Sequence, residues 1–255
     1  MSGMALRCSD LDITVNDRML VQDLQLQFVP GTITCVLGRN GTGKSLTLHT
    51  LAGLRSFDKG ALQLGTESLA TISRRSVAQQ LAFVAQDIEE PFPVTVLECA
   101  VSGRHPHIDF WQWESTDDYA LARQSLSEVD LGDFAERSVQ TLSGGERRRL
   151  AIAVALTQAP NILVLDEPIN HLDPQHQLQV LKLLRRKADE GRTVIMTLHD
   201  PNLALQFGDQ ALLLFGDGRW IHGDMSILND ASISELYRTP MRTIRIDDRM
   251  MVINI

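Results

Sequence analysis

The sequence predicts an α/β protein with a mostly parallel sheet, an N-terminal antiparallel β subdomain and an inserted helical subdomain. Short apolar runs such as 162–165 and 193–197 alternate with helical patterns, as in parallel sheets that are buried on both faces. Segments 5–15 and 24–28 alternate or cluster in the manner of antiparallel strands. Between 87 and 141 the chain becomes acidic and proline-rich, and then helical.

Length and composition fit this organisation. The 255 residues are near the upper limit for one hydrophobic core, so we expect a single domain over 1–255. Its core and β subdomain are expected to span 1–86 and 142–255, with the helical subdomain at 87–141. No run approaches the roughly 20 apolar residues of a membrane span, and no secretory signal is recognised, so we expect a cytoplasmic location.

The net charge and the three cysteines each give one expectation. The net charge of −8 gives no general attraction to phosphate backbones, so we expect no nucleic acid partner. Cys8, Cys35 and Cys99 are widely spaced in apolar runs and are expected to be buried, reduced thiols.

The first strands are expected to form a hairpin. A polar turn at Asn16-Asp17-Arg18 separates segments 5–15 and 24–28, and Pro30-Gly31 ends the second segment. This hairpin should lie beside the ligand site that begins directly after it.

A glycine-rich loop joins a predicted strand at 32–37 to a predicted helix whose apolar stripe runs from Leu46 to Leu54. The loop residues are Gly38, Arg39, Asn40, Gly41, Thr42, Gly43, Lys44 and Ser45. Glycines let backbone N–H groups converge, Lys44 can reach the β- and γ-phosphates, and the Ser45 hydroxyl can ligate Mg²⁺. The alternative is an ordinary glycine turn, which the position between a strand and a helix disfavours. The loop therefore predicts a P-loop NTPase core that binds a nucleoside triphosphate.

The insertion offers two further candidates. The elements expected around it are an edge strand at 61–65, a short basic helix at 72–80, a buried strand at 81–84, and helices at 94–101 and 119–129. In the loop between those last helices, His105 and His107 could bind a metal only with a third ligand, so a polar loop is the favoured interpretation. Trp111 and Trp113 are interpreted as packing groups, with contact to a partner as the alternative.

The remaining elements follow the same alternation. They are a helix from Ser143 to about Thr157, a strand at 162–165, a helix at 175–188, strands at 193–197 and 211–215, a helix at 232–237 and one or two C-terminal strands. Ser143 and the glycines after it suit an anion-binding helix N-terminus. Gln86, Asp166 and His199 each follow a strand of the parallel sheet, so we expect them to meet at its carboxyl edge.

Taken separately, Gln86, Asp166-Glu167 and His199 indicate no more than polar residues at strand ends. In this order after the phosphate loop, and with Leu142 to Glu146 giving Leu-Ser-Gly-Gly-Glu, they resemble the ATP-binding cassette (ABC) ATPases. The resemblance covers roughly residues 5 to 225.

The resemblance implies that the protein binds ATP and Mg²⁺, and it assigns a role to each residue of these motifs. The implied metal ligands are Ser45, Gln86 and Asp166. Lys44, the rest of the loop and Leu46 would bind the nucleotide. Glu167 would orient or deprotonate the attacking water, while His199 contacts the γ-phosphate and Gln86 touches Mg²⁺ or water.

The resemblance also implies a second copy of the chain. Ser143, Gly144, Gly145 and Glu146 cannot reach the nucleotide of their own chain. In the family this helix end caps the nucleotide of a second subunit, with Asp173 lying across the interface, so that a head-to-tail dimer encloses two ATP molecules.

Several positions depart from the family pattern. Leu46 stands where threonine is frequent, Ile169 interrupts the commoner Glu-Pro-Thr-Asn, and Pro201 follows His199-Asp200. None of these removes a group that touches phosphate or metal. Val15 stands where many relatives carry a tyrosine that stacks on adenine, so we expect weak recognition of the base.

Among ABC ATPases, the favoured function is the ATP-hydrolysing motor subunit of an importer. Residues 95–107 and 170–177 resemble the importers of metal chelates, namely ferric siderophores, haem, cobalamin or molybdate. This implies transmembrane permease subunits, a substrate-binding protein and a position on the inner face of the cell membrane. Changes at Phe92, Glu98 or Arg104 would then uncouple transport.

Two alternatives remain. One is a soluble ABC ATPase of an assembly system such as iron-sulfur cluster building. The other is a nucleic-acid or ribosome ATPase, which usually carries two cassettes in one chain or a long coiled coil, and neither is found here.

Overall fold

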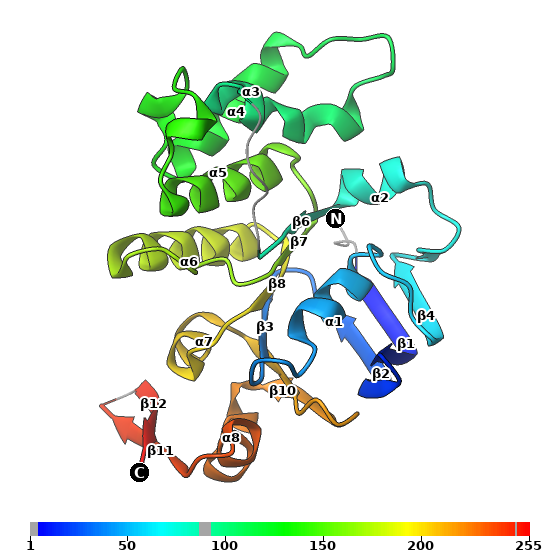
Figure 1. Ribbon diagram of the computed structural model, residues 1–255, viewed down its shortest axis with the longest axis vertical. Helices are drawn as coiled ribbons and strands as arrows, with labels where there is room; N and C mark the ends of the chain where they lie inside the picture. The colour runs from blue at the N-terminus through cyan, green and yellow to red at the C-terminus, as the bar shows by residue number, and fades with distance from the viewer. Residues whose placement is uncertain (1–4, 87–92, 248) are drawn as a thin grey trace.

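A computed structural model describes residues 5–86, 93–247 and 249–255. Its strands form a central, mostly parallel sheet, an antiparallel sheet and a C-terminal hairpin, and a group of helices lies at one end (Figure 1). The predicted α/β fold with its two subdomains is confirmed. The exact subdomain bounds stay a prediction, because 87–92, including Phe92, lie outside the described residues.

The central sheet has the strand order β10-β9-β3-β8-β7-β6. Its strands are β3 (Ile33–Leu37), β6 (Leu81–Val84), β7 (Ile162–Leu165), β8 (Thr193–Thr197), β9 (Gln210–Leu214) and β10 (Trp220–Asp224). The pairs from β9 to β6 are parallel, whereas β10 runs antiparallel to β9. The sequence pattern does not predict β10, because an edge strand needs no continuous apolar run.

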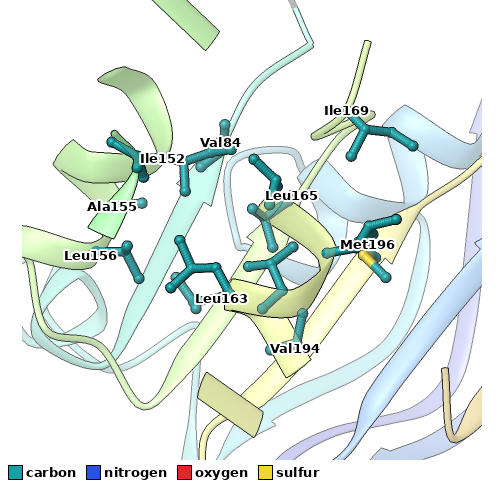
Figure 2. Close-up of a cluster of buried hydrophobic side chains, with 14 of the residues drawn as sticks. Val84, Ile152, Ala155, Leu156, Leu163, Leu165, Ile169, Val194 and Met196 are labelled. Carbon is teal, nitrogen blue, oxygen red and sulfur yellow. The ribbon is translucent and has the colours of Figure 1, made fainter. Parts of the chain in front are cut away.

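The two faces of this sheet belong to two separate cores, as parallel sheets require. Leu163 and Leu165 of β7 pack in one core with Ile152 of α5 (Gly144–Thr157), and Figure 2 shows these side chains together. Ile162 and Val164, which alternate with them, pack in the other core. That second core also contains α1 (Lys44–Leu51) and the antiparallel sheet.

The antiparallel sheet has the order β2-β1-β4-β5. Its strands are β1 (Leu6–Val15), β2 (Arg18–Phe28), β4 (Lys59–Leu64) and β5 (Glu67–Ser68). The predicted hairpin is confirmed, and Asn16 and Asp17 alone form its turn, with φ of 46° and 61°. The prediction of an edge strand at 61–65 is wrong, because β4 lies between β1 and the short β5.

The helical subdomain packs on α5. Its elements are α3 (Val96–Val101), the 3-10 helix η1 (Ser102–His107), α4 (Thr116–Glu128), and the 3-10 helices η2 (Gly132–Phe134) and η3 (Val139–Thr141). The segment from Gly103 to His107, expected as a loop, is thus a 3-10 helix. His107 Nε2 donates to the Gln158 carbonyl, and no group of three or more His, Cys, Asp or Glu suited to a metal occurs among the described residues.

The interpretation of the two tryptophans as packing groups is wrong. Trp111 and Trp113 are 90% and 89% exposed, and the neighbouring Phe110 is 88% exposed. Apolar character alone could not show this, because a packed ring and an exposed ring have the same sequence signal.

Helices and a hairpin complete the fold. They are α2 (Arg74–Gln80), α6 (Pro174–Asp189), α7 (Pro201–Phe207), the 3-10 helix η4 (Met225–Ile227), α8 (Asp230–Tyr237), β11 (Met241–Ile246) and β12 (Arg249–Asn254). Cys8 and Cys35 are buried free thiols and Cys99 is half-buried, and burial raises the pKa of Cys8 to about 12. Across the described ranges, no helix is both long enough and apolar enough to cross a bilayer.

Candidate active site

A cavity of about 600 Å³ lies at the carboxyl edge of the central sheet, as the strand order predicts. It is lined by Val15, Arg18, Leu20, Asn40, Gly41, Gly43, Lys44, Ser45, Leu46, Gln86, Glu167, Asn170 and His199. The structure therefore brings most of the expected loop, Gln86, Glu167 and His199 to one place. Asp166, expected at the same edge, is not among the residues that line the cavity. Val15 and Arg18, which flank the hairpin turn, contribute one part of the wall.

The phosphate loop is shaped by its glycines. Gly41 and Gly43 have φ of 77° and 95°, which L-residues with a side chain rarely adopt. A Cβ on Gly43 would lie 2.9 Å from Leu20 Cδ1, so the close approach of β2 also requires glycine. Gly43 caps α1 without a side-chain hydrogen bond, which leaves the first N–H groups of the helix available to an anion.

Lys44 is held inside the loop. Its side chain is buried, and Nζ donates to the carbonyls of Gly38 at 2.8 Å and Arg39 at 3.2 Å. Burial lowers the pKa of Lys44, while the negative charges of Glu167 and Asp166 oppose that shift. A cation in this position faces the space in which phosphate groups would sit.

Asp166 directly follows β7 and is buried. The Thr197 hydroxyl donates to Asp166 Oδ1 at 2.7 Å and accepts the Glu167 N–H at 2.6 Å. Oδ2 of Asp166 is also buried and has no hydrogen-bond partner among the described residues. A buried carboxylate oxygen without a donor is an appropriate ligand for a hard cation.

Glu167 is oriented from both sides. Its backbone is left-handed, with φ of 50°, which turns the side chain into the cavity. Oε1 is hydrogen-bonded to His199 Nε2 at 2.7 Å, and Oε2 accepts from Asn170 Nδ2. Sequence reasoning gave Asn170 no role, and its only signal is its position three residues after Glu167.

Gln86 lines the cavity just after β6, and a buried arginine supports its backbone. Arg148 of α5 donates to the carbonyls of Ala85, Gln86 and Asp166, and to Pro168 at 3.3 Å. One side chain thus joins the chain after β6 to the chain after β7. The sequence analysis missed Arg148, because its burial depends on how α5 packs against the sheet.

Other predicted residues do not line this cavity. Ser143 and Glu146 form a capping box, in which Ser143 Oγ accepts the Glu146 N–H at 3.3 Å and Glu146 Oε2 accepts the Ser143 N–H at 2.7 Å. Gly144 and Gly145 open the same helix, and Asp173 caps α6 by accepting the His176 N–H at 2.9 Å. Gly38, Arg39 and Thr42 belong to the phosphate loop but do not line the cavity.

Comparison with known proteins identifies this arrangement. The family described as ABC transporter matches residues 21–170, more than half of the chain. The chain belongs to the ABC transporter family. Membership in the ABC transporter family makes ATP its nucleotide and ATP hydrolysis its reaction.

Relatives within the ABC transporter family are import ATP-binding proteins. The iron(3+)-hydroxamate import ATP-binding protein of Bacillus subtilis is 36% identical over 211 residues, covering 82% of this chain and 78% of the relative. The hemin import ATP-binding protein of Hahella chejuensis is 35% identical, covering 89% and 90%.

A solved structure described as an inward-facing conformation of a metal-chelate type ABC transporter superposes on the chain with a TM-score of 0.85. It is 29% identical and covers 99% of this chain and 97% of the other. Because 99% of the chain is covered, the agreement includes the central sheet and both subdomains that Figure 1 shows.

Proposed function

We propose that the protein is the ATP-hydrolysing motor subunit of an importer for a metal chelate, such as a ferric siderophore, haem, cobalamin or molybdate. One observation carries the ATPase assignment: an anion-binding loop and the Glu167–His199 pair line the same cavity. Two relatives are named as import ATP-binding proteins for iron(3+)-hydroxamate and for hemin, and these names support the substrate class.

The residues divide the chemistry among them. The loop N–H groups and Lys44 bind the phosphates of ATP, which neutralises charge on the leaving group. Glu167 holds the attacking water in line with the γ-phosphorus and accepts its proton through Oε1 or Oε2. His199, hydrogen-bonded to Glu167, contacts the γ-phosphate and keeps the carboxylate in place.

The donor set fits a divalent cation. The Ser45 hydroxyl and the Gln86 side-chain oxygen belong to residues that line the cavity. Asp166, which directly precedes the lining residue Glu167, adds the buried Oδ2 that has no hydrogen-bond partner among the described residues. Bound there, Mg²⁺ would neutralise the β- and γ-phosphate oxygens.

A second copy of the chain would complete the site. Ser143 and Gly144 are exposed at the N-terminus of α5, and Asp173 is exposed at the N-terminus of α6. We propose that these ends, with Gly145 and Glu146, face the ATP of the partner copy in a head-to-tail dimer. ATP would then hold the two copies together, and its hydrolysis would release them.

The membrane partners follow from the importer assignment. We propose that the helical subdomain docks on transmembrane permease subunits at the inner face of the cell membrane, and that a substrate-binding protein delivers the chelate. Glu98 closes the capping box of α3, and Arg104 pairs with Asp118, so changes at either residue also act on the subdomain fold. Coupling experiments at these positions therefore need a stability measurement beside them.

The test is recovery of the permease. The tagged protein, isolated from detergent-solubilised membranes of its own source in the presence of ATP, should carry an apolar multi-span subunit. Addition of the chelate-loaded binding protein should stimulate its ATPase activity. Recovery of soluble partners alone would support the alternative, an ABC ATPase of an assembly system.

A further inference from the structure

The last helix and the last two strands form one unit, which we call the C-terminal unit (α8, β11 and β12). The Ser234 hydroxyl donates to the Met241 carbonyl at 3.0 Å and accepts the Met241 N–H at 2.9 Å. Asp230 Oδ1 accepts the Thr243 N–H at 2.6 Å. These bonds join α8 to β11, and β11 pairs with β12 along its whole length.

The C-terminal unit touches the chain that carries His199. The Tyr237 hydroxyl, at the end of α8, donates to the His199 carbonyl at 3.2 Å. Three residues later, Asn202 Nδ2 donates to the Val252 carbonyl at 3.1 Å, and Asn202 Oδ1 accepts the Val252 N–H at 2.7 Å. The short segment 199–202 is therefore held at both ends by the C-terminal unit, which lies beside α7 in Figure 1.

The other hydrogen bonds of this region are made by the neighbours of His199. The Leu198 N–H donates to the Val36 carbonyl at 3.2 Å, and Asp200 Oδ1 accepts the Asn202 N–H at 2.8 Å. β8 ends at Thr197, and α7 begins at Pro201, so His199 lies at a junction outside both elements. The His199 side chain is 43% exposed, and its Nε2 is hydrogen-bonded to the catalytic carboxylate of Glu167. Without regular backbone pairing at this residue, the anchors on its main chain decide where the imidazole points.

Tyr237 is suited to be such an anchor. Burial, with a smaller contribution from the charge of Asp200, raises the pKa of Tyr237, so the phenol stays a proton donor. Tyr237 does not line the cavity, and its bond goes to the backbone of His199, so it can act on the reaction only through that residue.

We propose that Tyr237 is a positioning residue for ATP hydrolysis, which holds the His199 backbone so that the imidazole meets Glu167 and the γ-phosphate. The two hydrogen bonds between Asn202 and the Val252 backbone hold the other end of the segment and help to fix the position of His199. This inference rests on the proposed function, because it assumes that His199 serves the hydrolysis of ATP. It gives the C-terminal unit a role in catalysis rather than only in packing.

Tyr237→Phe removes the hydroxyl and keeps the ring. A hydrogen bond of ordinary strength is lost, so kcat should fall about two- to tenfold. KM and the Kd for ATP should change less than kcat does, because the phosphate loop and Lys44 keep all their contacts with the nucleotide. Tyr119→Phe, the same deletion in α4 of the helical subdomain, is the matched control and should retain the wild-type kcat. Asn202→Ala should lower kcat as Tyr237→Phe does.

A double-mutant cycle tests the route through His199. In a His199→Ala protein, measured by single-turnover phosphate release, Tyr237→Phe should cause no further loss. An equal loss in both backgrounds, a wild-type kcat for Tyr237→Phe, or a change confined to KM would overturn the inference. The proposed function fails differently, since then the wild type would not hydrolyse ATP or His199→Ala would be as fast as wild type.

Discussion

Nε2 of His199 and Oε1 of Glu167 lie 2.7 Å apart, although 32 positions separate the two residues in the chain. β7 and β8 are adjacent parallel strands, so the residues that follow them meet at one edge of the sheet. The second oxygen of Glu167 is held by Asn170. The carboxylate is thus oriented before any substrate arrives, and the predictions below follow from this geometry and from the loop that faces it.

Glu167→Gln should bind ATP and scarcely hydrolyse it, because the amide keeps the shape of the side chain and loses the basic oxygen. Loss of a general base typically lowers the rate by about 10²- to 10⁴-fold. The variant should accumulate as an ATP-bound dimer, which phosphate release and light scattering would detect together. Near wild-type turnover, or a monomer in excess ATP, would contradict the role of Glu167.

Lys44→Ala should lose nucleotide affinity instead of turnover alone. The substitution removes a buried ammonium that would contact the phosphates, and a hydrogen bond to a charged group is worth enough to weaken binding about 10- to 100-fold. Titration with a fluorescent ATP analogue measures this loss. Lys182→Ala, at an exposed position of α6, should bind as the wild type does; an equal loss there would point to general charge effects.

The wild type should hydrolyse GTP and ATP with similar efficiency, because Val15 lines the cavity and offers no ring to stack on the base. An aromatic ring in that place contributes roughly 0.5 to 1.5 kcal/mol. Val15→Tyr should therefore favour ATP by up to about tenfold. Titration of both nucleotides against both proteins tests this. A strong preference for ATP in the wild type, unchanged by the tyrosine, would mean that another residue holds the adenine.

Asp118→Asn should destabilise the helical subdomain by about 1 to 2 kcal/mol at neutral pH. Arg104 Nε donates to Asp118 Oδ1 at 2.7 Å, and both side chains are largely buried. This bond, with help from Ser115, lowers the pKa of Asp118 from 3.8 to about 2. The folded-state pKa is depressed, so the stabilisation is present above the ordinary pKa and is lost as pH falls through the folded one.

Urea denaturation at several pH values measures this effect. The difference between wild type and Asp118→Asn should shrink as pH falls from about 4 towards 2. Asp117→Asn, at an exposed position in the same turn of α4, should cost little at any pH. A difference that does not depend on pH would show that the charge of Asp118 is not what stabilises the subdomain.

Much of the site could be predicted because its signals are local. A strand buried on both faces has to be continuously apolar, so β3, β7 and β8 were recognisable, and the side chains that follow them had to meet. The phosphate loop carried its own glycine signature. Neither conclusion needed a long-range contact.

The parts that escaped prediction depend on packing. Asn170 reaches Glu167 because residue 167 takes a left-handed conformation, and a glutamate in the sequence does not indicate a positive φ. Arg148 is buried by the face that α5 presents to the sheet. α7 is short and begins at a proline after its capping Asp200, so it lacks the repeated apolar spacing that marks longer helices.

The left-handed backbone at Glu167 sets stability against activity. A residue with a Cβ in this conformation costs on the order of 1 kcal/mol, and a glycine would avoid that cost. A screen for heat-resistant variants that measures the melting temperature alone would therefore select Glu167→Gly. That variant would melt at a higher temperature but lack the carboxylate that holds the attacking water, so the screen has to measure turnover as well.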